Sequence, residues 1–191
     1  MKPMMTKDKA IVLALAGLLP IFVSAQAMGQ SELIELPGMG GGFATSAGIS
    51  LDGRVVVGAA WTGDPEIHSF YWTPTGGMID LGTLGGGYSF PSTVSADGRV
   101  VIGRSTTSGN LENHAFRWTQ SDGMLDLGTL GGAYSSAENI SADGKVIVGG
   151  SATLNWWQTH AFRWTQADGL ADLGTLGGVN SMAHGVSSDG K

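Results

Sequence analysis

The chain has 191 residues, of which 32 are glycine and none is cysteine, and its formal net charge is −6 at pH 7. The lack of cysteine excludes disulfides, thiolate metal sites and a lipid anchor attached to cysteine. A negative chain without a basic stripe is unlike a nucleic-acid-binding protein, and it is repelled by an anionic membrane surface. The composition therefore indicates an acidic, glycine-rich protein that binds neither nucleic acid nor anionic lipid.

The first 27 residues have the order of a secretory signal peptide. Three lysines among the first nine residues precede an apolar run at 10–23, and an A-x-A pattern follows at 25–27. The run has 14 residues, whereas a membrane-spanning helix needs about 20. We expect cleavage near Ala27 and export of residues 28–191 to the extracellular space, the cell surface or the periplasm. No integral membrane segment is expected after cleavage.

The rest of the chain is one sequence unit repeated. The phrase DLGTLGG occurs three times at intervals of 46 residues, beginning at Asp80, Asp126 and Asp172. ELPGMGG at 35–41 is a diverged copy of the same phrase, 45 residues before the first full copy. This period defines units at about 35–79, 80–125 and 126–171, with a partial unit at 172–191.

Other residue types follow the same period. Histidine recurs at His68, His114 and His160, and tryptophan at Trp72, Trp118 and Trp164. Asp-Gly pairs stand at 52–53, 97–98, 143–144 and 189–190. A pattern this regular is typical of a structural unit copied along the chain.

Within a unit the pattern is that of β-strands. Apolar and polar residues alternate in HAFRW, and again in MLDLG after a turn, which predicts a hairpin pairing Trp118 with Leu125. Arg117 then lies opposite Asp126. A second hairpin is predicted at 138–150, where Asp-Gly separates two β-rich runs.

Two hairpins give four short strands in about 46 residues, which is the signature of a β-propeller blade. No segment after residue 27 keeps a helical period. We therefore expect an all-β fold of propeller-like blades. About three and a half units form an incomplete ring, since closed propellers use about four to eight blades. A β-solenoid is the alternative architecture.

These motifs resemble a known family. HAF-W followed by DLGTLGG and ISADG-V-VG is similar to the HAF-type extracellular repeats of bacterial exported proteins, from Glu35 to the C-terminus. The likeness is full in two copies and diverged in the first. It implies an extracellular β-repeat array with no assigned chemistry. Some such arrays resemble passenger regions of autotransporters, and the ISADG hairpins are also similar to those of WD-type and TolB-like propellers.

The periodic histidines and aspartates are the first candidates for catalysis or metal binding. Both functions need different groups to converge on one point, whereas these residues stand on successive units. In the predicted register His114 faces Thr129, and the aspartates form cross-strand ion pairs, Arg117 with Asp126 and Arg163 with Asp172. We therefore interpret His68, His114, His160, Asp80, Asp126 and Asp172 as structural, with no metal site.

The glycine-rich phrase is not a nucleotide-binding loop. A P-loop needs a lysine and a following helix, and GTLGG has neither. We interpret the phrase as the joint between units and expect no cofactor. The periodic aromatics, Trp72, Trp118 and Trp164 among them, are expected to fill the space between neighbouring units.

One stretch breaks the repeat. LNWWQ at 154–158 replaces GNLEN and GDPEI of the other units. Adjacent tryptophans in a surface connection mark a contact site, so Trp156 and Trp157 are the candidate contact residues for a ligand or partner. Partial burial after drift of the loop sequence is the alternative.

Together these observations predict an exported repeat scaffold for binding or surface interaction, whose partner is a protein or a glycan. Two alternatives are a fragment of an autotransporter passenger or adhesin-like region, and a propeller-type secreted hydrolase. The second lacks a non-repeating cluster of acid, base and nucleophile, so we expect no enzymatic activity. Because the last copy stops within its second hairpin, we expect either a longer parent protein or self-association.

Overall fold

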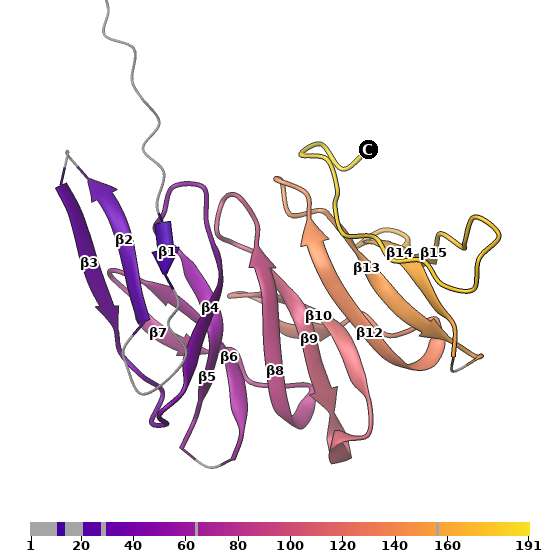
Figure 1. Cartoon of the computed structure of the whole chain (residues 1–191), viewed down its shortest axis with the longest axis horizontal. Helices are drawn as coiled ribbons and strands as arrows, with labels where there is room; N and C mark the ends of the chain where they lie inside the picture. The colour runs from indigo at the N-terminus through magenta and orange to yellow at the C-terminus, as the bar shows by residue number, and fades with distance from the viewer. Residues whose placement is uncertain (1–10, 14–20, 28–29, 64, 156) are drawn as a thin grey trace, which may run out of the picture.

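The computed structural model describes residues 11–13, 21–27, 30–63, 65–155 and 157–191. Apart from one short 3-10 turn, η1 (Ser108–Asn110), the elements are β-strands. From β4 on, the strands follow one another across the molecule in chain order (Figure 1). The expected all-β fold is confirmed for the described residues.

A three-stranded antiparallel sheet stands at the N-terminal side. It consists of β1 (Ile11–Leu13), β2 (Ile21–Ala27) and β3 (Gln30–Leu36). The predicted signal peptide overlaps the first two strands, while 1–10 and 14–20 lie outside the described residues. Cleavage near Ala27 therefore stays a prediction. Within the described ranges, no helix has the length and apolarity needed to cross a membrane.

Twelve further strands form one mixed sheet made of three antiparallel groups. The first group is β4 (Ala44–Ile49), β5 (Val56–Trp61), β6 (Ile67–Thr73) and β7 (Gly77–Asp80). The second is β8 (Gly85–Val94), β9 (Val101–Thr107), β10 (Asn113–Thr119) and β11 (Gly123–Asp126). The third is β12 (Gly131–Ile140), β13 (Val146–Thr153), β14 (Thr159–Thr165) and β15 (Gly169–Asp172).

The groups are joined only weakly through the sheet. A single parallel residue pair, Ile67 with Tyr88, links the first group to the second. Asn113 with Tyr134 links the second to the third in the same way. The three groups correspond to the three sequence copies, and DLGTLGG spans from the last strand of one group to the first strand of the next.

The predicted hairpin register is wrong by one residue. Trp118 pairs with Met124 and Arg117 with Leu125, so Trp118 does not face Leu125. The reason lies in the turn. Thr119 pairs with Gly123, whose φ of 72° lets three residues close the loop, one fewer than the predicted register requires. Strand alternation does not reveal such a glycine.

The shifted register also overturns the expected ion pairs. Arg117 contacts Asp122 at 3.5 Å instead of Asp126. In the next group Arg163 contacts Asp168 at 3.8 Å instead of Asp172.

The core lies between the groups. Phe116 and Trp118 of the second group pack against Val57 and Leu81 of the first. The same arrangement recurs one unit later, where Phe162 and Trp164 pack against Ile102, Ala115 and Leu127. The tryptophans Trp72, Trp118 and Trp164 are each 6% exposed. The prediction that periodic aromatics fill the space between neighbouring units is confirmed for Trp118 and Trp164, whereas Trp72 packs within the unit 35–79, on Leu36 and Val56.

Candidate functional site

Each periodic histidine is held by the periodic aspartate of its own group. Nδ1 of His114 lies 2.8 Å from a carboxylate oxygen of Asp126. The corresponding distances are 2.8 Å for His68 with Asp80 and 2.9 Å for His160 with Asp172. The expected partner of His114, Thr129, is therefore incorrect: the hairpin register brings the histidine diagonally to the aspartate.

Two of the histidines have a second carboxylate on the other ring nitrogen. Glu112 lies 3.1 Å from Nε2 of His114, and Glu66 lies 3.5 Å from Nε2 of His68. In the third group the matching residue is Gln158. Within the described part of the chain, no three His, Asp or Glu side chains are arranged to hold a metal ion.

The aspartate also shapes the joint that follows it. Asp126 accepts a hydrogen bond from the Gly128 N–H at 2.7 Å, and Gly128 has a φ of 76°. Ser135, on the next group, accepts the Ala115 N–H at 2.8 Å and donates to the Gly128 carbonyl at 2.6 Å. DLGTLGG thus connects two groups through glycine geometry and a bridging serine.

The tryptophan candidates lie at one end of the strands. Trp157 is 58% exposed in the loop between β13 and β14. Trp156 lies outside the described residues. Because β13 runs from the Asp-Gly turn at 141–145 to this loop, the two features stand at opposite ends of that strand.

The Asp-Gly turns repeat one hydrogen-bonded design. In the third group the Ser141 hydroxyl donates to Asp143 at 2.7 Å and accepts the Val146 N–H at 3.0 Å. The same carboxylate accepts the Lys145 N–H at 3.1 Å. The Ser141 hydroxyl first, and then the N–H and ammonium groups of Lys145, hold the pKa of Asp143 below its usual value. Each turn therefore presents a fixed, ionised carboxylate.

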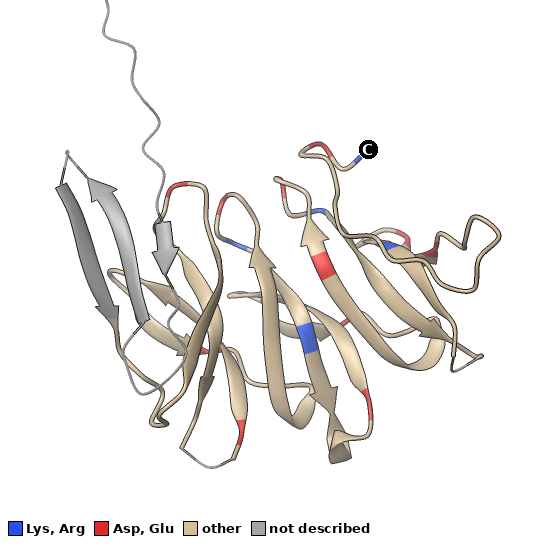
Figure 2. Cartoon of the chain, in the orientation of Figure 1, with Lys and Arg blue, Asp and Glu red and all other residues tan. Residues whose placement is uncertain are grey.

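A basic residue follows each of these turns, and in the last three turns it lies within ion-pair distance of the turn aspartate. Lys145 Nζ lies 3.1 Å from Asp143, and Arg99 Nε lies 3.8 Å from Asp97. Acidic and basic residues stand side by side at successive turns (Figure 2). Successive turns also contact one another, since the Leu51 N–H donates to the Ala96 carbonyl at 3.0 Å.

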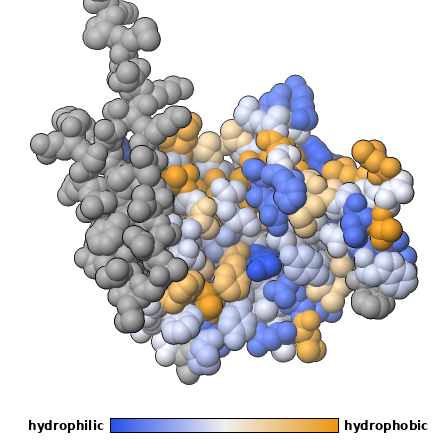
Figure 3. Space-filling view, viewed as in Figure 1, coloured by the Kyte–Doolittle hydropathy of each residue, from blue (hydrophilic) through white to orange (hydrophobic). Residues whose placement is uncertain are grey.

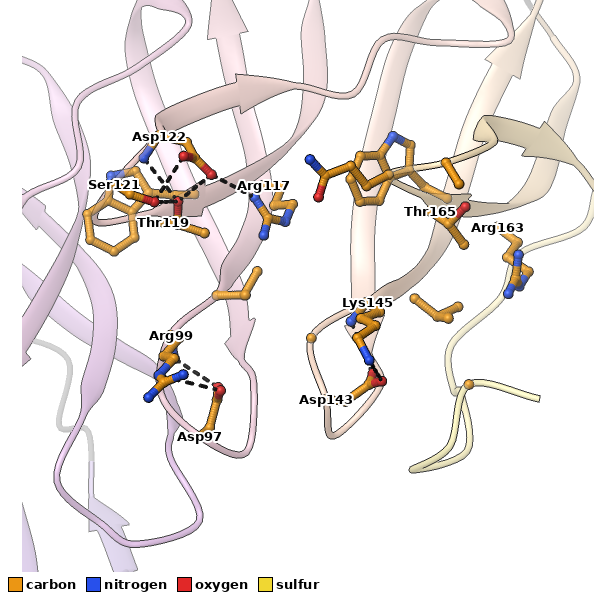
Figure 4. A pocket seen from close by; sticks show the side chains of 18 of the residues that line it. Asp97, Arg99, Arg117, Thr119, Ser121, Asp122, Asp143, Lys145, Arg163 and Thr165 are labelled. Carbon is orange, nitrogen blue, oxygen red and sulfur yellow. Dashed lines mark hydrogen bonds and ion pairs between the residues drawn. The ribbon is translucent and has the colours of Figure 1, made fainter.

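A groove of about 1030 Å³ runs along the last three of these turns, those of Asp97, Asp143 and Asp189. Its other wall comes from the β10–β11 and β14–β15 hairpin turns, and the side chain of Arg117 lies between the two walls (Figure 4). The charged residues in its lining are Arg99, Arg117, Lys145, Arg163 and Lys191, with Asp97, Asp122, Asp143 and Asp189. The groove therefore presents both signs of charge, in pairs.

Sequence reasoning missed the groove and placed the contact site elsewhere. In the sequence the Asp-Gly pairs indicate turns only, and nothing in the pattern assigns a role to their carboxylates or to the basic residue after each pair. The available signal was the recurrence of Arg or Lys after every Asp-Gly pair, at Arg54, Arg99, Lys145 and Lys191. Trp157 is not among the residues that line the groove.

The chain is similar in fold to solved structures of TolB. No family model matches the sequence, and no curated protein matches it. TolB from Acinetobacter baumannii has 18% identity and a TM-score of 0.56, over 80% of this chain and 37% of that one. A putative TolB from Agrobacterium tumefaciens has 16% identity and a TM-score of 0.54, over 81% of this chain and 56% of that one.

This likeness concerns the fold alone, because both identities are below 25%. The chain spans less than two thirds of the length of either structure.

Proposed function

We propose that this protein is an exported, non-enzymatic scaffold that binds a protein or glycan partner through the groove along its Asp-Gly turns. The proposal includes a signal peptide at 1–27 and membership of the HAF-type repeat proteins. It also takes each four-stranded group as one propeller blade. The repeated HAF-W and DLGTLGG phrases and the fold likeness to TolB support these assignments.

The observation that carries the binding function is the charge of the groove. Five basic and four acidic residues line it, whereas the whole chain has a net charge of −6. A carboxylate-bearing sugar or peptide is repelled by most of the surface and least repelled here. The volume also suits a ligand site, since such sites usually measure about 300–1,000 Å³ and contain a few convergent polar groups.

The test is a screen of the purified protein on arrays of neutral and acidic glycans and of short charged peptides. The decisive variant is Arg99→Ser with Lys145→Ser, because these side chains are 84% and 79% exposed. We expect binding about tenfold weaker or worse, with little change in melting temperature.

Arg54→Ser is the matched control. Arg54 follows the Asp-Gly pair of the first group but does not line the groove, so this variant keeps full binding. The proposal is overturned if no probe binds, or if the double variant binds as well as the control.

A further inference from the structure

One cross-strand pair departs from the repeat in a single unit. The first two strands of each group are paired, and one equivalent rung places Thr45 opposite Ala59, Phe90 opposite Arg104, and Ser136 opposite Gly150. The pairs of the first and third groups consist of small residues. The second pair alone carries a cation and an aromatic ring, so both of its members differ from the repeat together.

The cation of this pair is held over the ring of its partner. The guanidinium carbon of Arg104 lies 5.5 Å from the centroid of the Phe90 ring, within the distance at which an aromatic face attracts a cation. Nη1 of the same side chain donates to the Tyr134 hydroxyl of the next group at 3.4 Å. Two aromatic side chains from neighbouring groups therefore fix the position of the guanidinium.

Most of the hydrogen-bonding capacity of this guanidinium is unused. Arginine has five N–H donors, and among the described residues the side chain of Arg104 donates to the Tyr134 hydroxyl alone. No carboxylate of the described residues lies within ion-pair distance of it, and the nearby Glu138 is bonded by the Ser136 hydroxyl at 2.7 Å instead. Arg104 is exposed. Figure 3 shows a strongly hydrophilic spot beside apolar atoms, at the place of β9 in Figure 1.

The other basic residues after residue 27 differ from Arg104 in their partners. Five of them lie within ion-pair distance of an aspartate: Arg99, Arg117, Lys145, Arg163 and Lys191. The remaining one, Arg54, is exposed and has no such partner, but no described aromatic ring lies under its guanidinium. Arg104 therefore combines a fixed position with a charge that no carboxylate of the described chain neutralises.

The first joint has the tyrosine without the cation. Tyr88 forms the same parallel bridge to the preceding group as Tyr134 does at the second joint. The rung there holds Thr45 and Ala59, and Ala59 is 1% exposed. Two groups therefore pack together without an arginine at this rung, so the fold does not require the pair of Phe90 and Arg104.

We propose that Phe90, Arg104 and Tyr134 form a binding site for a uronic acid sugar, whose carboxylate pairs with the guanidinium. The free N–H groups of an arginine match a carboxylate in a bidentate pair. One cation neutralises the single charge of a carboxylate but not the double charge of a phosphate, which a chain of net charge −6 repels. The tyrosine hydroxyl and the aromatic rings suit a sugar, because its hydroxyls and its apolar C–H face lie on one small ring. None of the three residues lines the groove, so this site is separate from it.

The experiment is isothermal titration calorimetry of the protein with trigalacturonic acid at low salt, and the methyl ester of the same sugar is the neutral probe. We expect the acid to bind and the ester to bind at least about tenfold more weakly. Phe90→Thr with Arg104→Ala installs the pair that the first group carries at this rung. This variant therefore keeps the circular dichroism spectrum of the parent, and it binds the acid at least about tenfold more weakly.

Two single variants separate the shape of the guanidinium from its charge. Arg104→Lys keeps the charge but loses the planar fork, so it also weakens binding of the acid. Arg54→Gln removes one charge at an exposed arginine that no aromatic ring holds, and it leaves binding unchanged.

The proposal is overturned if the ester binds as well as the acid, or if the Phe90 and Arg104 double variant binds as well as the parent. Tighter binding of an acetylated triaspartate peptide than of trigalacturonic acid overturns the assignment to a sugar. The groove variant Arg99→Ser with Lys145→Ser keeps the binding that depends on Arg104. If the groove variant alone abolishes binding of the acid, the site at Arg104 is wrong while the proposed function of the groove stands.

Discussion

Nδ1 of His114 lies 2.8 Å from the carboxylate of Asp126, twelve residues later in the chain. An ionised carboxylate only accepts hydrogen bonds, so we assign a proton to Nδ1. The histidine side chain is 15% exposed and the aspartate side chain 42% exposed. The bond fixes the end of β11 to the start of β10, where the joint to the next group begins.

The first prediction concerns the three histidines as equivalent structural residues. His68→Ala, His114→Ala and His160→Ala each lower the free energy of unfolding by about 1–3 kcal/mol, because each removes a bond to a charged group. Urea denaturation measures the loss. His184→Ala is the control at an exposed histidine. If one of the three alone abolished a hydrolytic or metal-dependent activity, the non-enzymatic assignment would fail.

The second prediction is a loss of stability in acid. The pKa of Asp143 lies below 3.8 in the folded protein, chiefly because Ser141 donates to it. As the pH falls below about 4 the unfolded chain takes up a proton first, so the stability that this group contributes is lost as the pH drops through the folded pKa. The lowered pKa values of Asp52 and Asp189, where the Ser50 and Ser187 hydroxyls are the main cause, act in the same direction.

Ser141→Ala tests this assignment. It lowers stability at every pH, because the Val146 N–H loses its acceptor, and it also makes the acid loss smaller. Melting temperatures between pH 7 and pH 2 show both effects. The exposed Ser108→Ala serves as control. If the melting temperature of Ser141→Ala falls between pH 7 and pH 2 by as much as that of the parent, the assignment is wrong.

The third prediction addresses the tryptophans singled out by the sequence. Replacing Trp156 and Trp157 with Ala leaves the melting temperature nearly unchanged, because Trp157 is 58% exposed. If the pair is a contact site in addition to the groove, partner binding is lost at the same time. A large fall in melting temperature with binding intact identifies the pair as core residues instead.

The fourth prediction compares two glycines of the second group. A Cβ on Gly103 lies 2.1 Å from the Phe90 carbonyl oxygen and 3.0 Å from the Phe116 ring, so both must shift. Gly128 has a φ of 76° and nothing within 4 Å of its Cβ position. Gly103→Ala therefore destabilises by at least about 3 kcal/mol, and Gly128→Ala by about 1–2 kcal/mol. If urea denaturation gives the same loss of unfolding free energy for both variants, the contrast between a steric clash at Gly103 and backbone strain at Gly128 is wrong.

The repeat made the fold class and the packing of the aromatics predictable. Phe116 and Trp118 alternate with polar residues, so both side chains lie on one face of the strand. Because this apolar face recurs every 46 residues, the face of one unit can pack against the neighbouring unit. The register was not predictable, because the positive φ of Gly123 shortens the turn without changing the alternation. The groove was not predicted because residues from all three groups line it. These residues are far apart in the sequence, and the pattern does not show that they lie close together in the fold.

The last prediction uses one leucine position in two environments. Leu127→Ala opens a cavity between two groups, since Leu127 is 7% exposed and packs near Phe162 and Trp164. It lowers the free energy of unfolding by about 2–5 kcal/mol. Leu173→Ala changes a side chain that is 55% exposed, so its loss stays below about 1 kcal/mol.

Urea denaturation of both variants separates the buried position from the exposed one. The loss for Leu127→Ala is the larger, because its partners Phe162 and Trp164 belong to the next group of the same chain. A large loss for Leu173→Ala means that this leucine is buried in the folded protein, contrary to its exposure of 55%.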